Sequence, residues 1–147
     1  REEGYFNGRE DGKMIEYSES GKIISSGKFI NGEKEGDWSY FSGDHIEKGS
    51  YITGLREGVW HYYYLDDKLH FEGKFIQGLA QGKHKFYYPS GIIKEERYFD
   101  MGIREKNWKK YDSFGNVKMT ITYKHNTEYR INGEKINLPE GSFKTIK

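Results

Sequence analysis

The chain has 147 residues, and its 24 lysines and arginines nearly balance its 23 aspartates and glutamates, leaving a formal net charge of +1. This balance does not indicate a nucleic-acid or anionic-membrane partner, and the length suits one domain or one repeat array. The absence of cysteine excludes disulfides, thiolate metal sites and a cysteine nucleophile. Mean hydropathy is −0.98 and no apolar run approaches the ~20 residues of a membrane span, so we expect no integral membrane segment and no nucleic-acid partner.

One pattern recurs along the chain, starting with residues 5–17 (YFNGREDGKMIEY), which begin with an aromatic residue and carry glycines three and seven positions later. The same spacing returns in FINGEKEGDWSYF, YITGLREGVWHYY and FIQGLAQGKHKFY. Counting the starting aromatic residue as zero, these stretches carry Trp or His at position nine and an aromatic residue at position twelve. In FDMGIREKNWKKY, Lys106 replaces the second glycine. A fixed period in the twenties predicts a repeat architecture. The units begin near residues 5, 29, 51, 75, 99 and 123.

The second half of each unit predicts a returning strand. Residues 69–75 (LHFEGKF) and 117–123 (VKMTITY) alternate between two faces, which in so short a run favours a half-buried strand. The outgoing run around Trp38 and Phe41 is rich in aromatic residues, which also favours strand. The second unit is two residues shorter than the others, and we place this loss in its turn. The sequence therefore predicts an all-β fold, an elongated single-layer antiparallel sheet of about six tandem β-hairpins with a period of about 24 residues.

Glycines occupy two kinds of position in this pattern. The first kind lies two residues before the starting aromatic residue, where the missing side chain lets a neighbouring ring pack over bare backbone. The second kind lies in the connection between hairpins, where we expect positive φ angles in loops that face water. The structural glycines of the first kind are Gly27, Gly49 and Gly73, and those of the second are Gly32, Gly36, Gly54, Gly58, Gly78 and Gly82.

Several short stretches could carry chemistry, but each fits a structural role better. Residues 21–29 (GKIISSGKF) have one residue too many between their glycines for a phosphate-binding loop. The five histidines show no metal-ligand spacing, although His61 and His70 could approach each other across one hairpin. Neighbouring carboxylates such as Glu95 and Glu96 indicate solvated charge rather than a catalytic pair. We therefore predict no enzyme activity, no cofactor and no metal site.

Two columns of aromatic residues cross the predicted sheet. Their positions have opposite parity in a strand, so we expect them on opposite faces, with one column partly exposed. An exposed aromatic strip with charged neighbours is typical of a protein-interaction surface, which makes both columns candidates for partner binding. The same rings could instead serve packing alone, or stack on sugars. The candidate residues are Trp38, Trp60, His84 and Trp108 in one column and Phe41, Tyr63, Tyr87 and Tyr111 in the other.

The motif G-x-[FY]-x-x-G-x-x-x-G-x-W-x-x-[YF] resembles a MORN repeat, and more closely the MORN-variant repeats of bacterial YwqK-family proteins, which are described as antitoxin components. The resemblance covers residues 2 to about 126 and implies a scaffold or binding surface without catalytic residues of its own. In the last unit, Asn126 and Arg130 replace the two glycines. We therefore expect a repeat array over residues 1–126 and a cap or tail over residues 127–147.

These features favour a non-enzymatic scaffold that binds a protein partner along one face, and the resemblance implies that this partner could be a toxin. The alternative is a cell-surface module that binds polysaccharide through its aromatic strips. Free sheet edges at the two ends would also permit end-to-end self-association. Because the first residue is Arg1 rather than Met, a signal peptide or lipid anchor could precede it, and we slightly favour a bacterial envelope location over a cytoplasmic one.

Overall fold

The computed structural model describes residues 5–6 and 9–135, and every regular element in them is a β-strand. None of these residues forms a helix that could cross a membrane. The strands are β1 (Tyr5–Phe6), β2 (Arg9–Glu10), β3 (Gly12–Tyr17), β4 (Ile23–Ile30), β5 (Glu33–Phe41), β6 (His45–Ile52), β7 (Leu55–Tyr64), β8 (Leu69–Ile76), β9 (Leu79–Tyr87), β10 (Ile93–Asp100), β11 (Ile103–Arg104), β12 (Lys106–Tyr111), β13 (Val117–Lys124), β14 (Thr127–Ile131) and β15 (Glu134–Lys135).

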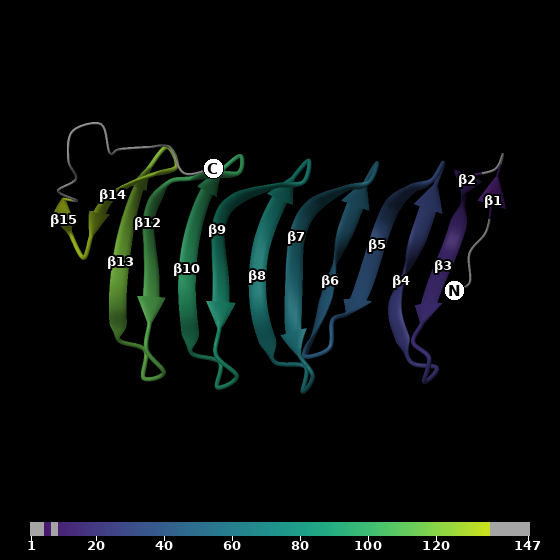
Figure 1. The fold of residues 1–147 in the computed structure, drawn as a ribbon, viewed down its shortest axis with the longest axis horizontal. Coiled ribbons are helices and arrows are strands. Elements are labelled where there is room, and N and C mark those ends of the chain that lie inside the picture. Colours follow the sequence, from purple (N-terminus) through teal and green to yellow (C-terminus); the bar gives the residue numbers. More distant parts are fainter. Residues whose placement is uncertain (1–4, 7–8, 136–147) are drawn as a thin grey trace.

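The strands from β3 to β15 form one antiparallel sheet of 13 strands. They lie side by side in sequence order, from β3 in purple to β15 in yellow (Figure 1). The short β11 pairs with β10, which also pairs with β12. β1 and β2 pair separately as a two-stranded sheet. The structure thus confirms the predicted array of successive hairpins in one open sheet.

The sheet continues past residue 126, the predicted end of the repeat array. Residues 127–135, which the sequence assigns to a cap or tail, continue the same sheet as β14 and β15. The remainder of the predicted tail, residues 136–147, lies outside the described residues.

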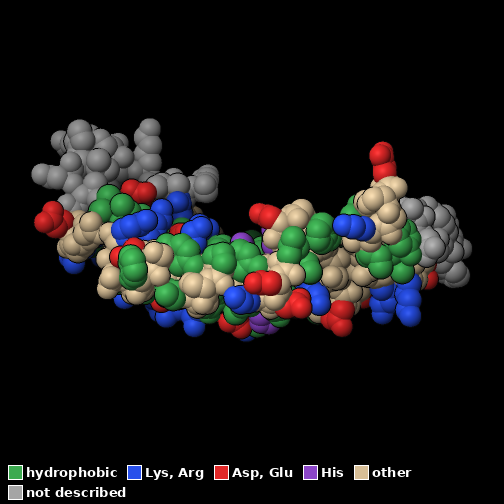
Figure 2. Space-filling model, turned by 90° about the horizontal axis from the view of Figure 1, so that it is seen from below, with side chains coloured by type: hydrophobic (Ala, Val, Ile, Leu, Met, Phe, Trp, Pro, Cys, Tyr) green, Lys and Arg blue, Asp and Glu red, His purple; other side chains and the backbone are tan. Residues whose placement is uncertain are grey.

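The molecule is a thin, elongated slab when it is viewed from the side on which the hairpin turns lie (Figure 2). With only one layer, the sheet has its buried cluster on one face, which we call the core face, and we call the opposite face the open face. Large rings suit this arrangement because each buries ~150–250 Å² without a second layer of secondary structure. The buried cluster consists of Met14, Phe29, Trp38, Tyr51, Trp60 and Phe71.

Four of the hairpins share a turn geometry that includes a bulge. In the hairpin β7–β8, Tyr62 faces Phe71 and Tyr63 faces Leu69, so His70 is an extra residue on the returning strand. Ile24, Lys94 and Lys118 occupy the same position in their hairpins.

The hairpin β5–β6 has no such bulge, because Phe41 faces Ile46 in an uninterrupted register. Four residues, 42–45, separate the last facing pair of this hairpin, whereas five residues, 64–68, separate Tyr63 from Leu69 in β7–β8. Placing the whole two-residue loss of this unit in its turn was therefore wrong. One residue is lost from the turn and one from the bulge.

The connections between hairpins are tight turns in which both central residues have positive φ. Thr53 and Gly54 have φ angles of 51° and 79°, and Gln77 and Gly78 have 50° and 81°. Positive φ was predicted for the glycines, and it is confirmed at all six of them. It was not predicted for the residue before the glycine, where a β-branched side chain such as that of Thr53 is strained.

Each of these turns is held by the connection that precedes it. Glu35 Oε2 accepts a hydrogen bond of 2.8 Å from the Thr53 amide, and the Lys34 carbonyl accepts one of 2.9 Å from the Gly54 amide. These bonds offset the strain at Thr53 because they satisfy both amides of the turn. The same side-chain bond joins Glu57 to Gln77, Gln81 to Met101 and Glu105 to His125.

Candidate interaction surface

The rings of Trp38, Trp60 and His84 lie on the core face, each over a glycine that has no side chain to exclude the ring. A Cβ added to Gly49 would overlap the Trp60 ring, and this ring is fully buried. Trp38 is 2% exposed and His84 is 4% exposed. These three candidate partner-binding residues therefore belong to the core and cannot contact a partner. The glycines covered in this way are Gly27, Gly49 and Gly73, as predicted.

The ring nitrogens of this column satisfy backbone carbonyls of the neighbouring strand. Trp60 Nε1 donates to the Ser50 carbonyl at 3.1 Å, and His84 Nε2 donates to the Lys74 carbonyl at 2.8 Å. Because a carbonyl only accepts, His84 must carry a proton on Nε2. Burial lowers the pKa of His84, which keeps the ring neutral. His84 therefore replaces tryptophan as a packing residue, and half-buried Trp108 makes the equivalent bond.

Cations cover the buried rings on the core face. The Arg56 guanidinium lies 4.2 Å from the centroid of Trp60 and donates to the Tyr62 hydroxyl at 2.8 Å. Lys34 lies 5.1 Å from the centroid of Trp38. A hollow of about 430 Å³ lies between these two cations, and Glu16 and Glu47 also line it. With both signs of charge around it, this hollow does not select for one kind of ion.

A histidine pair lies on the core face next to the shortened hairpin. His45 is bonded to Asp44 at 2.7 Å through Nδ1 and to Glu47 at 2.8 Å through Nε2, and its ring stacks on His70 at 5.2 Å. Burial alone would lower the pKa of His45, but its two carboxylate partners outweigh it and raise the pKa. Burial, followed by the charge of His45, lowers the pKa of His70.

His61 lies on the open face and bonds to Glu72 at 3.2 Å, so it does not meet His70 across the hairpin. Within the part of the chain that the structure describes, no group of three His, Cys, Asp or Glu side chains is arranged to hold a metal ion.

The twelfth-position rings lie on the open face, each opposite an aliphatic residue of the returning strand. Phe41 is 39% exposed and Tyr17 is 38% exposed, while Tyr63, Tyr87 and Tyr111 are half-buried. These residues cross the sheet next to the hairpin turns, and we call them the aromatic strip. The aromatic strip consists of the cross-strand pairs Tyr17–Ile23, Phe41–Ile46, Tyr63–Leu69, Tyr87–Ile93 and Tyr111–Val117.

Two tyrosines from the hairpin turns link neighbouring units of the aromatic strip. The Tyr64 hydroxyl donates to the Tyr87 carbonyl at 2.6 Å, and the Tyr88 hydroxyl donates to the Tyr111 carbonyl at 2.6 Å. Each bond reaches from one hairpin turn to the neighbouring hairpin, so the two bonds link the units that carry Tyr63, Tyr87 and Tyr111. Aromatic residues held in this way bind with little loss of conformational entropy.

The aromatic strip contains a small apolar notch at its N-terminal end. This notch has a volume of about 230 Å³, and its apolar lining includes Ile23, Phe41 and Ile46. Ser39 and Lys48 provide polar groups at the same notch. It is large enough for one apolar side chain and has a cation beside it.

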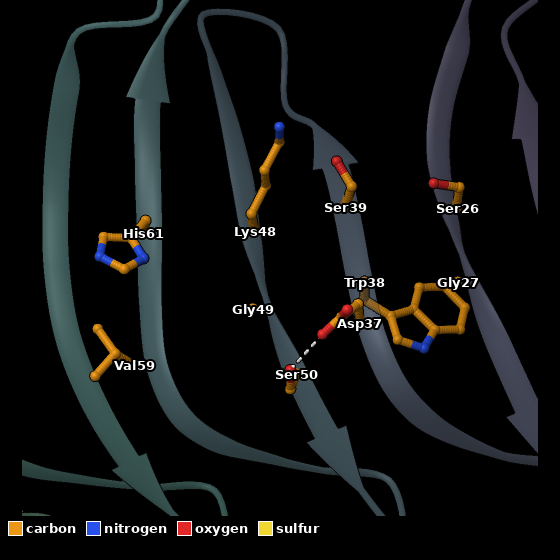
Figure 3. Close-up of a pocket in the computed structure, with 10 residues that line it drawn as sticks. All are labelled: Ser26, Gly27, Asp37, Trp38, Ser39, Lys48, Gly49, Ser50, Val59 and His61. Atoms are coloured by element: carbon orange, nitrogen blue, oxygen red, sulfur yellow. Dashed lines mark hydrogen bonds between the residues drawn. The ribbon is translucent and has the colours of Figure 1, made fainter.

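A wider polar hollow of about 530 Å³ adjoins the aromatic strip on the open face (Figure 3). It spans β4 to β7 and is hollow because Ser26, Ser39 and Ser50 place small side chains on three neighbouring strands. Asp37 accepts a hydrogen bond of 2.8 Å from the Ser50 hydroxyl, as Figure 3 shows. Lys48 also lines this hollow. Sequence reasoning missed it, although the three serines are visible in the sequence.

A row of charged residues next to the aromatic strip has more lysines than glutamates. Glu72 is bonded to His61, and Glu96 is paired with Lys83 at 3.2 Å. The Tyr111 hydroxyl donates to Glu96 at 2.9 Å. In contrast, three lysines in this row form no close ion pair with another described residue. Two of them lie opposite these glutamates on neighbouring strands, and the third lies 5.9 Å from the centroid of the Tyr63 ring, so the row has a net positive charge. These lysines are Lys48, Lys85 and Lys109.

The fold and its repeated contacts define a β-hairpin repeat protein, and comparison with protein families supports this class. Residues 10–31, 80–101 and 104–125 each match the family model of the MORN repeat variant. These segments correspond to the hairpins β3–β4, β9–β10 and β12–β13. Repeats of this kind are generally modules that bind proteins or membranes. No curated protein matches the chain.

Proposed function

We propose that this protein is a non-enzymatic scaffold that binds a protein partner through the aromatic strip. The observation that carries the proposal is the separation of the two aromatic columns. Trp38, Trp60 and His84 are buried on the core face. The aromatic strip lies on the open face, where the buried cluster does not cover it, and it stays partly exposed. Partly exposed Tyr and Phe residues, held rigidly and next to charged residues, are typical of protein-binding surfaces. The resemblance to antitoxin-like repeats makes a toxin one possible partner.

The test is capture of partners from the native cell with three versions of the chain. The first is the wild type, and the second carries Phe41→Ala and Tyr63→Ala in the aromatic strip. The matched control carries Ile52→Ala and Leu55→Ala, which are 54% and 49% exposed at the end of β6 and the start of β7, on the side of the sheet away from the hairpin turns. Circular dichroism establishes that each variant is folded.

We expect one protein to bind the wild type and the control but not the strip variant. The purified partner should then protect Tyr63 and its neighbours in the aromatic strip from hydrogen exchange. Equal capture by all three chains would contradict the proposal. Binding only to polysaccharide or only to lipid vesicles, with no protein partner, would also contradict it.

A further inference from the structure

We propose that the occupant of the aromatic strip is an acidic, proline-rich segment in the polyproline II conformation. This inference rests on the proposed function, because it names the chemistry of the partner at the same surface. Three observations carry it: the spacing of the strip, the pairing of the backbone groups within the sheet, and the net positive charge of the row beside the strip.

The spacing of the aromatic strip matches polyproline II more closely than an α-helix. One unit advances two strands, or ~9.6 Å, and three polyproline II residues advance ~9.3 Å. Seven α-helical residues advance ~10.5 Å. Over the four intervals from Tyr17 to Tyr111, the accumulated difference in length between the strip and a polyproline II segment is ~1 Å. For a helix with a seven-residue pattern, the accumulated difference is ~4 Å. Every third residue of polyproline II therefore meets the same kind of site.

The hydrogen bonding of the sheet disfavours an added β-strand at this surface. The backbone groups of β5 to β10 are paired with neighbouring strands, so the face above them offers side chains rather than free amides. A β-strand ligand needs main-chain partners at a sheet edge. A polyproline II segment has no internal hydrogen bonds and keeps its backbone solvated. The notch beside Phe41 supplies an apolar site of about 230 Å³ for a proline ring.

The charge of the neighbouring row identifies the second component of the ligand. Lys48, Lys85 and Lys109 form no close ion pair with another described residue, whereas Glu72 and Glu96 are already bonded within the chain. The row carries three lysines against two glutamates on neighbouring strands, so it keeps a net positive charge that carboxylates on an incoming segment would meet. Such rim contacts contribute mainly to specificity and association rate, and salt weakens them.

The test uses a fluorescent peptide that repeats Pro-Pro-Glu five times and two control peptides. One control repeats Pro-Pro-Lys, and the other is an acidic, helix-forming peptide of the same length with apolar residues at heptad spacing. Binding is measured by anisotropy to the wild type and to Tyr87→Ala, Lys85→Glu and Ile52→Ala, each verified as folded. The Ile52→Ala variant is the control because Ile52 lies outside the aromatic strip.

We expect only the Pro-Pro-Glu peptide to bind the wild type, with an affinity that falls at higher salt. Affinity should fall by about tenfold in Tyr87→Ala and Lys85→Glu and be unchanged in Ile52→Ala. Stronger binding of the helical or lysine peptide, or equal binding to every variant, would overturn the inference. If no peptide binds but the captured protein still depends on Phe41 and Tyr63, the inference fails while the proposed function stands.

Discussion

His84 and Lys74 are joined by a hydrogen bond from the imidazole Nε2–H to the backbone carbonyl, at 2.8 Å. Trp38, Trp60 and Trp108 each make the same contact with a carbonyl of the preceding strand. A histidine in a tryptophan position is thus tolerated because both rings present an N–H at the same place. The difference is that an imidazole can be protonated and an indole cannot.

The first prediction concerns the pH dependence of stability. Burial lowers the pKa of His84 in the folded chain, so below the ordinary histidine pKa of about 6.5 the unfolded chain binds more protons. The contribution of His84 to the free energy of unfolding is therefore present above this pH and is lost as the pH falls. The variant His84→Trp should lose less stability between pH 8 and pH 5.5 than the wild type does, as measured by urea unfolding. His45 and His70 titrate in both chains, so parallel losses would show that His84 does not titrate as described.

The second prediction concerns the glycine beneath Trp60. Gly49→Ala should lower the free energy of unfolding by about 3 kcal/mol, because the added carbon overlaps a fully buried ring. The matched control is Gly58→Ala, where φ is +77° and no atom lies within 4 Å of the added carbon. This control should cost only about 1 kcal/mol of backbone strain. Lys106 shows that a side chain is tolerated there, since it occupies the equivalent position with a φ of 60°. Equal destabilisation of the two variants in urea unfolding would contradict the packing argument.

The third prediction tests the side-chain bond that closes each turn between hairpins. Glu57→Ala should lower the free energy of unfolding by about 1 kcal/mol, because the Gln77 amide loses its acceptor. Glu57→Gln should have little effect, since Gln81 already performs this role for the Met101 amide at 2.7 Å. Hydrogen exchange at Gln77 should be faster in the alanine variant than in the glutamine variant. Identical exchange in both would mean that the side chain does not close the turn.

The fourth prediction concerns the stacked histidines. The pKa of His45 is raised by Asp44 and Glu47 against the effect of burial, and the pKa of His70 is lowered by burial and by the charge of His45. NMR titration should therefore find His45 above and His70 below the ordinary histidine range. In the variant His45→Gln, the pKa of His70 should rise because one source of repulsion is removed. An unchanged pKa for His70 would show that the charge of His45 does not contribute to the shift.

Much of the fold could be predicted from the sequence because the repeat fixes both the strands and their faces. The glycine two residues before the starting aromatic residue predicted that a ring packs over bare backbone. The structure confirms this contact between Trp60 and Gly49. The parity of positions nine and twelve placed Trp60 and Tyr63 on opposite faces, as the structure has them. Parity alone did not establish which face is buried.

What could not be predicted depends on backbone register. The bulge at His70, and its absence in the hairpin β5–β6, follow from which amide pairs with which carbonyl, and residue types do not specify this pairing. The stack of His45 on His70 follows from that register and was missed for the same reason. The acceptor before the second glycine, by contrast, was visible in the sequence. Asp11, Glu35, Glu57, Gln81 and Glu105 recur at one position of the repeat.

The turn-closing bonds also have a direction, because each acceptor precedes its donor in the chain. Glu35 and Lys34 accept bonds from Thr53 and Gly54, which lie one unit later. During synthesis on the ribosome, the acceptors are therefore in place before the turn that needs them emerges. All of these contacts span about 20 residues, so each joins one unit only to its neighbour in the chain. The array can therefore be completed hairpin by hairpin in the order of translation, because each finished turn supplies the hydrogen-bond acceptors for the next one.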